Sequence, residues 1–258
     1  MKNEISVIIP TIGGRESIIN AVESVINQKN VYTEIIIVFD NKPIDFELKK
    51  NFKDIILIQN IGNKGGNACR NLGASFAKYK FIAFLDDDDT WRDDKLIKQV
   101  KLILKSSTNT LIYTGKNIIT KSNNKTKIRY NYSKQTNASS LISLSKINFI
   151  GSTSSILLRK STFDKVRGFK EDLSALQDYE LYIRLAYNDV FFVGIDEPLL
   201  NYYITQNKSS VSMKFKKNYK SSLELLKLFK TIKTRSNFIL NIVLLYNLKV
   251  LFHRLRFI

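Results

Sequence analysis

The chain has 258 residues, of which 44% are hydrophobic, and this is enough for one large domain with a buried core, alone or followed by a tail. Its single cysteine, Cys69, excludes a disulfide framework and favours a reducing compartment. The chain contains no run of about 20 apolar residues, so we expect no membrane-spanning helix.

The formal net charge is +18, and the basic residues gather in two segments. Residues 95–163 contain 13 Lys or Arg and no Asp or Glu, and residues 214–258 contain 11 basic residues against one acid, Glu224. Such segments indicate an anionic partner, which from charge alone is a phosphate compound, a nucleic acid or an anionic membrane.

Short apolar strands alternate with helical segments through residues 1–94. Apolar residues recur at helical spacing over residues 16–28, and a second helix over 67–78 follows a loop that contains Gly62, Gly65 and Gly66. This alternation predicts an α/β fold with a mostly parallel, Rossmann-like sheet flanked by helices. The predicted strands are residues 5–9, 34–39, 55–58 and 79–85.

Residues 95–213 form the second half of the predicted domain, which spans residues 1–213. The one candidate boundary lies near Met213, and residues 214–258 read as a basic amphipathic helical tail. In the second half we predict helices at 95–104, 161–166 and 176–187, strands with a polar hairpin over 111–132, a partly β segment at 149–158, a strand at 190–193 and a polar loop at 206–212.

Four consecutive carboxylates, Asp86 to Asp89, follow the predicted strand 79–85 directly. Like charges at this spacing repel one another unless a cation neutralises them. Hard oxygen ligands at the end of a core strand suit Mg²⁺ or Mn²⁺, shared with the phosphates of a substrate. The alternative is a solvated acidic turn that leads into the helix beginning near Asp93.

Polar residues follow three of the predicted strands, with Thr11 after the first, Asp40 after the second and Asp86–Asp89 after the fourth. In a doubly wound sheet these ends line one edge, where ligands bind. Thr11 and Asp40 have the alternative role of turn or helix-capping residues. The chain lacks a Walker A sequence and an ordered G-x-G-x-x-G, which argues against a P-loop NTPase and a typical Rossmann dehydrogenase.

Several ordered motifs support a more specific interpretation. The first half contains SVIIPT at 6–11, EIIIVFDN at 34–41, GGNACRNLG at 65–73 and FLDDDD at 84–89. The second half contains Gly168-Phe169 with Leu173, then QDYEL at 177–181 and RLA at 184–186. Together these motifs resemble glycosyltransferase family 2, whose members have the GT-A fold, over about residues 5–212.

The resemblance implies inverting transfer of a sugar from a nucleotide diphosphate sugar, with uridine diphosphate (UDP) as the leading choice of nucleotide. A divalent cation, Mn²⁺ or Mg²⁺, would be held by Asp88 with Asp86 nearby, and Asp178 would be the general base. The alternative for Asp178 is an acid that stabilises a helix N-terminus. The resemblance assigns the nucleotide sugar to Thr11, Asp40, Gly66, Arg70, Asp86 and Asp87.

Some positions depart from the family pattern. Ile12-Gly13-Gly14 follows Thr11, where the family usually has an aromatic residue, and Asp40 is followed by Asn41 rather than by a second acid. Residues 201–212 contain no histidine, although many members have one there that can reach the metal. We expect Arg184 to pair with a local carboxylate or phosphate, and we expect His253 to have no catalytic role.

The tail suggests a location for the protein. Tyr219, Leu223, Leu226 and Phe229 fall on one helical face among lysines, and residues 238–252 are mostly apolar but short for a membrane span. This pattern suits an interfacial anchor on anionic lipid, and the alternative is packing on the domain or on another subunit. With no secretory signal before the first strand, we expect a cytoplasmic protein peripheral to the inner face of the plasma membrane.

The expected acceptor is a lipid-linked glycan in bacterial surface polysaccharide biosynthesis, by analogy with the family. Two other functions remain open, a nucleic-acid-binding basic protein and a catalytically inactive scaffold. Nucleic acid is disfavoured as a partner because aromatic residues do not alternate with the basic ones and the acidic run would repel phosphates. The sequence does not decide whether the chain forms an oligomer.

Overall fold

The structure is a computed structural model that describes residues 3–14, 16–62, 65–106, 109–122, 125–131, 140–204, 211–231 and 233–240. Its strands are β1 (Glu4–Thr11), β2 (Tyr32–Asp40), β3 (Ile55–Asn60), β4 (Phe81–Phe84), β5 (Thr90–Trp91), β6 (Thr110–Ser122), β7 (Lys125–Asn131), β8 (Leu157–Arg159) and β9 (Phe191–Ile204). Its helices are α1 (Ser17–Ile26), α2 (Phe46–Asn51), α3 (Gly65–Phe76), α4 (Lys95–Lys105), α5 (Ser140–Lys146), the 3-10 turn η1 (Thr153–Ser155), α6 (Lys160–Lys165), α7 (Gln177–Tyr187) and α8 (Val211–Leu228).

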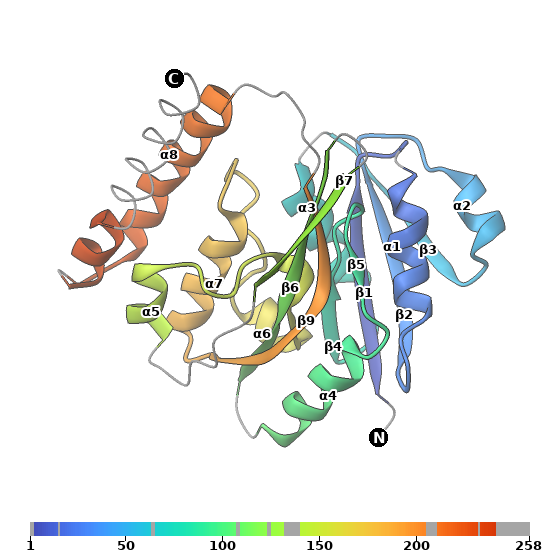
Figure 1. The fold of residues 1–258 in the computed structure, drawn as a ribbon, viewed down its shortest axis with the longest axis horizontal. Coiled ribbons are helices and arrows are strands. Elements are labelled where there is room, and N and C mark those ends of the chain that lie inside the picture. The colour runs from blue at the N-terminus through green and yellow to red at the C-terminus, as the bar shows by residue number, and fades with distance from the viewer. Residues whose placement is uncertain are drawn as a thin grey trace.

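Within the described residues, nine strands form one sheet in the order β3-β2-β1-β4-β8-β6-β9-β5, with β7 paired to β6 (Figure 1). The first four strands in this order are parallel, as the alternation of strands and helices predicts. The remaining strands are mixed, because β8 runs antiparallel to both β4 and β6 while β9 runs parallel to β6. The first half of the domain therefore has the strand order of a doubly wound α/β sheet, and the second half extends that sheet.

Helices cover both faces of the sheet, and the strands show the corresponding alternation of side chains. Ile8 belongs to a core cluster with α3, α6 and α7, whereas its neighbours Val7 and Ile9 belong to a second cluster with α1 and α4. Side chains of a strand alternate between faces, so a strand buried on both sides reads as a continuous apolar run. This is why β1 and β2 were recognisable from sequence.

Close packing of α3 on the sheet depends on one glycine. A Cβ atom added to Gly73 would lie 2.5 Å from Ile8 Cγ2, which is shorter than a van der Waals contact. The helix begins at Gly65, so Gly65 and Gly66 form its first residues rather than the loop expected from the sequence. Because the helix lies so near β1, Arg70 of α3 is held next to Thr11 at the end of β1 and Asp86 after β4.

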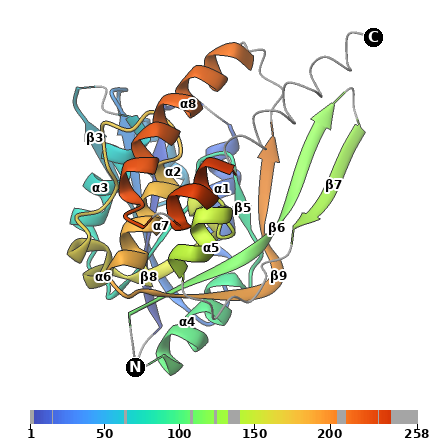
Figure 2. The same cartoon turned by 90° about the vertical axis from the view of Figure 1, so that its left-hand side faces the viewer.

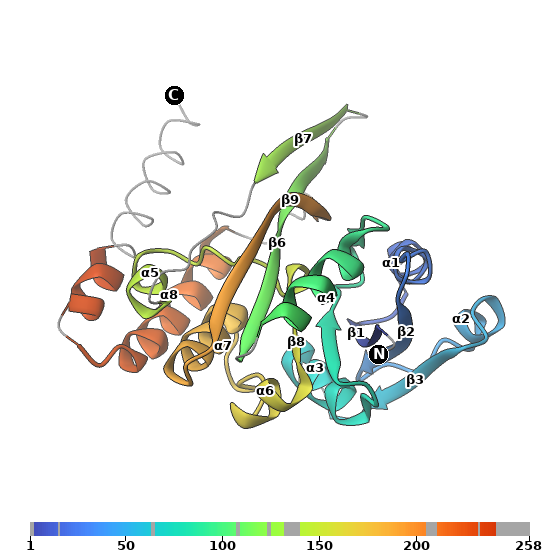
Figure 3. The same cartoon turned by 90° about the horizontal axis from the view of Figure 1, so that it is seen from below.

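Strand β9 is much longer than the predicted strand 190–193. It pairs with β6 from Phe191 to Ile204, with register shifts opposite Thr114, Gly115 and Lys116. Gly194 and Pro198 weaken the local β signal of this segment, but pairing along β6 overrides it. The hairpin of β6 and β7 projects beyond the body of the domain (Figures 2 and 3).

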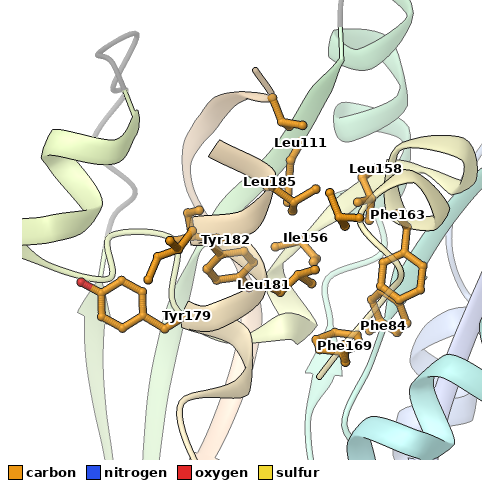
Figure 4. Close-up of a cluster of buried hydrophobic side chains, with 14 of the residues drawn as sticks. Phe84, Leu111, Ile156, Leu158, Phe163, Phe169, Tyr179, Leu181, Tyr182 and Leu185 are labelled. Atoms are coloured by element: carbon orange, nitrogen blue, oxygen red, sulfur yellow. The ribbon is translucent and has the colours of Figure 1, made fainter. Parts of the chain in front are cut away.

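An aromatic cluster joins the two halves of the domain. The ring centres of Phe84, Phe163 and Phe169 lie 5.2–5.5 Å from one another, and Leu181 and Leu185 of α7 belong to the same buried cluster (Figure 4). Phe84 precedes the acidic run, whereas α7 carries Asp178 at its second residue. The core therefore fixes the acidic run relative to the helix that carries the predicted base.

Helix α8 and a further helix over residues 233–240 pack on α5 and α7, with Leu225, Phe229 and Phe238 buried. Of the predicted apolar face, Tyr219 and Leu223 are exposed, Leu226 is half-buried and Phe229 is buried, so the face is divided between solvent and the domain. Ser221 and Ser222 are buried on the same face of α8 as Leu225, and this leaves Tyr219 and Leu223 directed toward solvent. No helix among the described residues is long and apolar enough to cross a membrane. Of the predicted loop 206–212, residues 211 and 212 instead begin α8, and the rest lies outside the described residues, as do the apolar segment from 241 onward and His253.

Candidate active site

The site lies where the order of the strands reverses. Strands β2 and β3 lie on one side of β1, and the chain then returns to place β4 on its other side. Ligands of open α/β sheets bind outside the carboxyl ends of the strands at such a point. Thr11 ends β1, Asp40 ends β2 and Asp86–Asp88 follow β4, and these polar strand ends meet at this crevice as the sequence predicts.

A first cavity of about 250 Å³ occupies the crevice. It brings together every residue that the sequence assigned to the nucleotide sugar and to the metal. Its lining residues are Pro10, Thr11, Ile12, Asp40, Gly66, Arg70, Asp86, Asp87 and Asp88.

Local hydrogen bonds fix the walls of this cavity. Thr11 Oγ1 donates to Asp87 Oδ2 at 2.6 Å and accepts from Gly13 N at 3.0 Å. Asp40 Oδ1 accepts from Gly65 N at 3.2 Å, which ties the end of β2 to the start of α3. Because Thr11 and Asp87 are both nearly inaccessible to solvent, their bond orders the first part of the acidic run before any ligand is present.

Arg70 and Asp86 form an ion pair between the first cavity and a second one. Arg70 Nη2 lies 2.5 Å from Asp86 Oδ1, and their side chains are 14% and 28% exposed. The guanidinium also lies over the ring of Phe169, 5.6 Å from its centre. Arg70 therefore neutralises one acid of the run and is oriented by the loop that precedes α7.

The neighbouring asparagines explain how that loop is held. Asn71 Nδ2 donates to Phe169 O at 2.9 Å, and Asn71 Oδ1 accepts from Phe169 N at 2.8 Å. Asn67 Nδ2 donates to Lys170 O at 2.7 Å. The polar face of α3 thus binds the main chain of residues 169 and 170, in the second half of the domain.

The second cavity, of about 260 Å³, contains Asp178. It shares Arg70 and Asp86 with the first cavity, so the two adjoin. Both are much larger than the roughly 30 Å³ of one water molecule. The second cavity is lined by Arg70, Asp86, Lys116, Gly151, Ser152, Thr153, Gln177, Asp178 and Tyr202.

Asp178 lies in the first turn of α7 and accepts a hydrogen bond from Tyr179 N at 2.7 Å. Burial raises the pKa of this carboxyl from 3.8 to about 6, an effect that Asp86 reinforces and that the Tyr179 amide, Arg70 and Lys116 oppose. A general base works best when its pKa is near the operating pH. Environment and position therefore both suit Asp178 to accept a proton inside this cavity.

Asp89 differs from the other three acids of the run because it is completely buried. Its Oδ1 accepts from Tyr203 N at 3.2 Å, which links the acidic run to β9. Burial and the charges of Asp86 and Asp88 raise the pKa of Asp89 to about 8, against the opposing hydrogen bonds of Ser154 and Tyr203. Asp89 lines neither cavity, and its hydrogen bond with Tyr203 N attaches the acidic run to β9.

Sequence reasoning did not single out the side chains that complete the second cavity. Lys116 and Tyr202 come from the long pairing of β6 with β9, and Ser152 and Thr153 come from the turn at η1. Ser154 Oγ accepts from Asp86 N at 3.1 Å, and Ser154 O accepts from Trp91 Nε1 at 2.8 Å. No local motif marks these residues, because they converge only through the sheet.

Arg184 has the local role expected from the sequence. It forms a two-pronged pair with Glu180, at 2.7 and 2.6 Å, and also donates to the carbonyl oxygens of Val166 and Gly168. These bonds brace α7 against the chain that follows α6. Arg184 lines neither cavity.

The acids of the first cavity fit a cation that is shared with a substrate. Among the described residues, no group of three or more His, Cys, Asp or Glu forms a metal-binding cluster. Mg²⁺, however, commonly takes only one or two protein carboxylates and completes its coordination with water and substrate phosphates. Asp86 and Asp88 line one cavity and provide such a pair.

Comparison with known proteins identifies the family. The sequence pattern described as Glycosyl transferase family 2 matches residues 6–167, which is more than half of the chain. The chain therefore belongs to glycosyl transferase family 2 and is a transferase of glycosyl groups. This match ends before Asp178.

Two curated relatives are similar to this chain at 28% and 32% sequence identity. The Erwinia amylovora amylovoran biosynthesis glycosyltransferase AmsB is 28% identical over 211 residues, which are 77% of this chain and 69% of AmsB. The Escherichia coli protein WfgD is named a UDP-Glc:alpha-D-GlcNAc-diphosphoundecaprenol beta-1,3-glucosyltransferase. It is 32% identical over 106 residues, which are only 40% of this chain and 42% of WfgD.

Solved structures confirm the fold. The S. aureus TarS fragment 1–349 in complex with UDP superimposes with a TM-score of 0.65 at 18% identity. The alignment covers 93% of this chain and 71% of the fragment. The predicted GT-A fold is thereby confirmed, since the likeness extends over both halves of the domain.

Proposed function

We propose that the chain transfers a sugar from UDP-sugar to a hydroxyl of a lipid-linked glycan, with inversion at the anomeric carbon, in bacterial polysaccharide biosynthesis. The nucleotide occupies the first cavity, where it contacts Thr11, Asp40, Gly66, Arg70, Asp86 and Asp87. Asp178 is the catalytic base in the second cavity. The observation that supports this most strongly is that the two cavities adjoin at Arg70 and Asp86.

The role of Asp178 follows from the geometry of a single displacement. The acceptor oxygen attacks the anomeric carbon from the face opposite the diphosphate, and the Asp178 carboxylate accepts the proton of that hydroxyl. The bond between the anomeric carbon and the diphosphate oxygen breaks as the new glycosidic bond forms. A covalent route would need a nucleophilic carboxylate close to the anomeric carbon and a second acid–base carboxylate, whereas one base serves this step.

Charge that develops on the leaving diphosphate also requires stabilisation. Asp88, with Asp86, would hold Mn²⁺ or Mg²⁺, and a bound divalent cation neutralises charge on phosphate oxygens. Arg70 lies at the same junction and supplies a guanidinium, whose planar group of donors suits phosphate. Thr11 keeps Asp87 in place beside these groups.

The choice of donor and acceptor draws on the relatives. TarS has been crystallised with UDP, and the name of WfgD specifies UDP-glucose and a diphosphoundecaprenol-linked acceptor. The name of AmsB specifies biosynthesis of a polysaccharide. A lipid-linked acceptor lies at a membrane surface, which is consistent with a basic tail that would bring the enzyme to the inner face of the plasma membrane.

The exposed side of α8 is suited to that surface. Tyr219 and Leu223 are exposed there together with Lys220 and Lys227, and Lys230 follows in the next turn of chain. Each basic residue near an anionic membrane surface contributes about 1 kcal/mol. Flotation with phosphatidylglycerol vesicles, against phosphatidylcholine vesicles as the neutral control, tests this part, and equal recovery with both would contradict it.

Calorimetric titration with UDP, GDP and dTDP, each with Mn²⁺ and with EDTA, tests the donor site. We expect UDP to bind with Mn²⁺ and much more weakly with EDTA, and we expect Asp88→Asn to abolish this difference. Asp93→Asn is the matched control, because Asp93 pairs with Lys29 and lines neither donor nor acceptor cavity. Folded protein that binds none of the three diphosphates would favour a scaffold or a nucleic-acid-binding protein.

A further inference from the structure

Lys116 lines the second cavity, and the proposed function gives it no role as base or metal ligand. Its Nζ lies 4.7 Å from the centre of the Tyr202 ring, on the neighbouring strand β9. A Cβ atom at Gly151 would lie 3.3 Å from Nζ, so the glycine leaves room for the amine. Gly151 also has a φ of +84°, which disfavours any other residue there.

The amine has no acidic partner among the described residues. None of the ion pairs in this part of the chain includes Lys116, although Asp178 and Asp89 lie within electrostatic range. Burial lowers the pKa of the Lys116 amine, and those two carboxylates oppose this effect. Lys116 is only partly buried, but a partly desolvated cation with no paired anion is still unfavourable, and an anionic ligand would offset that cost.

The position of Lys116 favours the acceptor over the donor as the source of that anion. Lys116 lines the cavity of Asp178 and not the cavity of Asp40 and Asp88. The donor diphosphate also already has Arg70 and the proposed cation site. Besides Arg70, Asp86 and Asp178, the same cavity is lined by Ser152, Thr153 and Gln177, which suit the hydroxyl groups of a sugar, and by Tyr202, which suits its apolar face.

We propose that Lys116 is a specificity-determining residue that binds a phosphate or carboxylate carried by the acceptor, close to the sugar hydroxyl that Asp178 deprotonates. The inference rests on the proposed function, which assigns this cavity to the acceptor. Two sources of the anion share this chemistry, the phosphate that links the first sugar to its lipid and the carboxylate of a uronic acid.

The experiment compares wild type with Lys116→Met and Lys116→Arg by calorimetry at saturating UDP and Mn²⁺. The three probes are N-acetylglucosamine 1-phosphate, glucuronate and the neutral methyl glycoside of N-acetylglucosamine. We expect wild type to bind one of the two anionic probes at least tenfold more tightly than the neutral glycoside. Lys116→Met removes that preference, and Lys116→Arg retains part of it.

Two controls separate this proposal from its alternatives. The affinity for UDP is expected to be the same in Lys116→Met as in wild type, which also shows that the variant is folded. Lys101→Met removes an exposed lysine of α4 and is expected to change nothing. Failure of wild type to bind UDP would instead contradict the proposed function.

Three results overturn the assignment of Lys116. The first is a loss of UDP affinity in Lys116→Met, which would make the lysine a donor ligand. The second is an equal loss for the charged and neutral probes, which would make it a packing residue. The third is wild-type protein that binds UDP but shows no preference for either anionic probe.

Discussion

Replacement of Asp178 by Asn should inactivate the enzyme and stabilise its fold. Asn has the same shape, and its side-chain oxygen can still accept the hydrogen bond from Tyr179 N. It cannot accept a proton from an acceptor hydroxyl, so we expect kcat to fall by about 10²–10⁴, the usual contribution of a general base. UDP should bind as in wild type, because Asp178 does not line the first cavity.

The gain in stability follows from the raised pKa of Asp178. A shift from 3.8 to about 6 corresponds to about 3 kcal/mol, at roughly 1.4 kcal/mol per pKa unit. Between these two values the folded wild type binds more protons than the unfolded chain, so its stability falls as the pH rises through this window. Asn does not titrate, so the variant should be more stable by up to about 3 kcal/mol above pH 6, and by little near pH 4.

The assay is urea denaturation in EDTA without nucleotide, at intervals from pH 4.5 to pH 7.5. Asp196→Asn, at an exposed position of β9, is the matched control and should not change stability. The same shift predicts that kcat/KM of the wild type, which reports the free enzyme, rises with pH and reaches half its plateau near pH 6. A variant that is less stable than wild type at pH 7.5, or one that retains full transferase activity, would refute the reasoning.

Three further variants test how the site is held. Thr11→Val removes a hydrogen bond to the buried Asp87 and should cost about 2 kcal/mol of folding free energy and weaken UDP binding, and unchanged UDP affinity would contradict its role. Ser154→Ala removes the acceptor of the first amide of the acidic run, so we expect about 1 kcal/mol lower stability and weaker Mn²⁺-dependent UDP binding, whereas loss of stability alone would show a purely structural role. Phe238→Ala opens a cavity against Tyr179 and should cost about 3 kcal/mol by thermal denaturation, with the exposed Leu240→Ala as a neutral control; equal losses would argue against tight packing of the tail.

The different environments of Asp86 to Asp89 could not be predicted from the sequence. Four adjacent carboxylates look equivalent in sequence, yet each has a different environment in the folded chain. Asp86 pairs with Arg70, Asp87 accepts from Thr11, Asp88 lines the first cavity, and Asp89 is buried against β9. These differences arise from partners that are 16 to 114 positions away along the chain, so no local pattern could assign them.

The sequence by itself determined the elements whose signals are local. Apolar runs predicted β1, β2 and β4, helical spacing predicted α1 and α7, and ordered motifs predicted the family, its fold and the residues that line the first cavity. These local signals were sufficient because an apolar run marks a strand that is buried on both faces, and the polar residue that faces the ligand follows that run directly in the chain.

Only the tertiary structure decided which residues complete the second cavity and how the tail packs. Lys116, Ser154 and Tyr202 meet through pairing of β6, β8 and β9 across long stretches of sequence, and the buried face of α8 is chosen by α5 and α7. Burial and the pKa of Asp178 also depend on those contacts. The physical reason is that periodicity reports which face of an element is apolar, whereas the neighbours of that face are set by the packing of the whole chain.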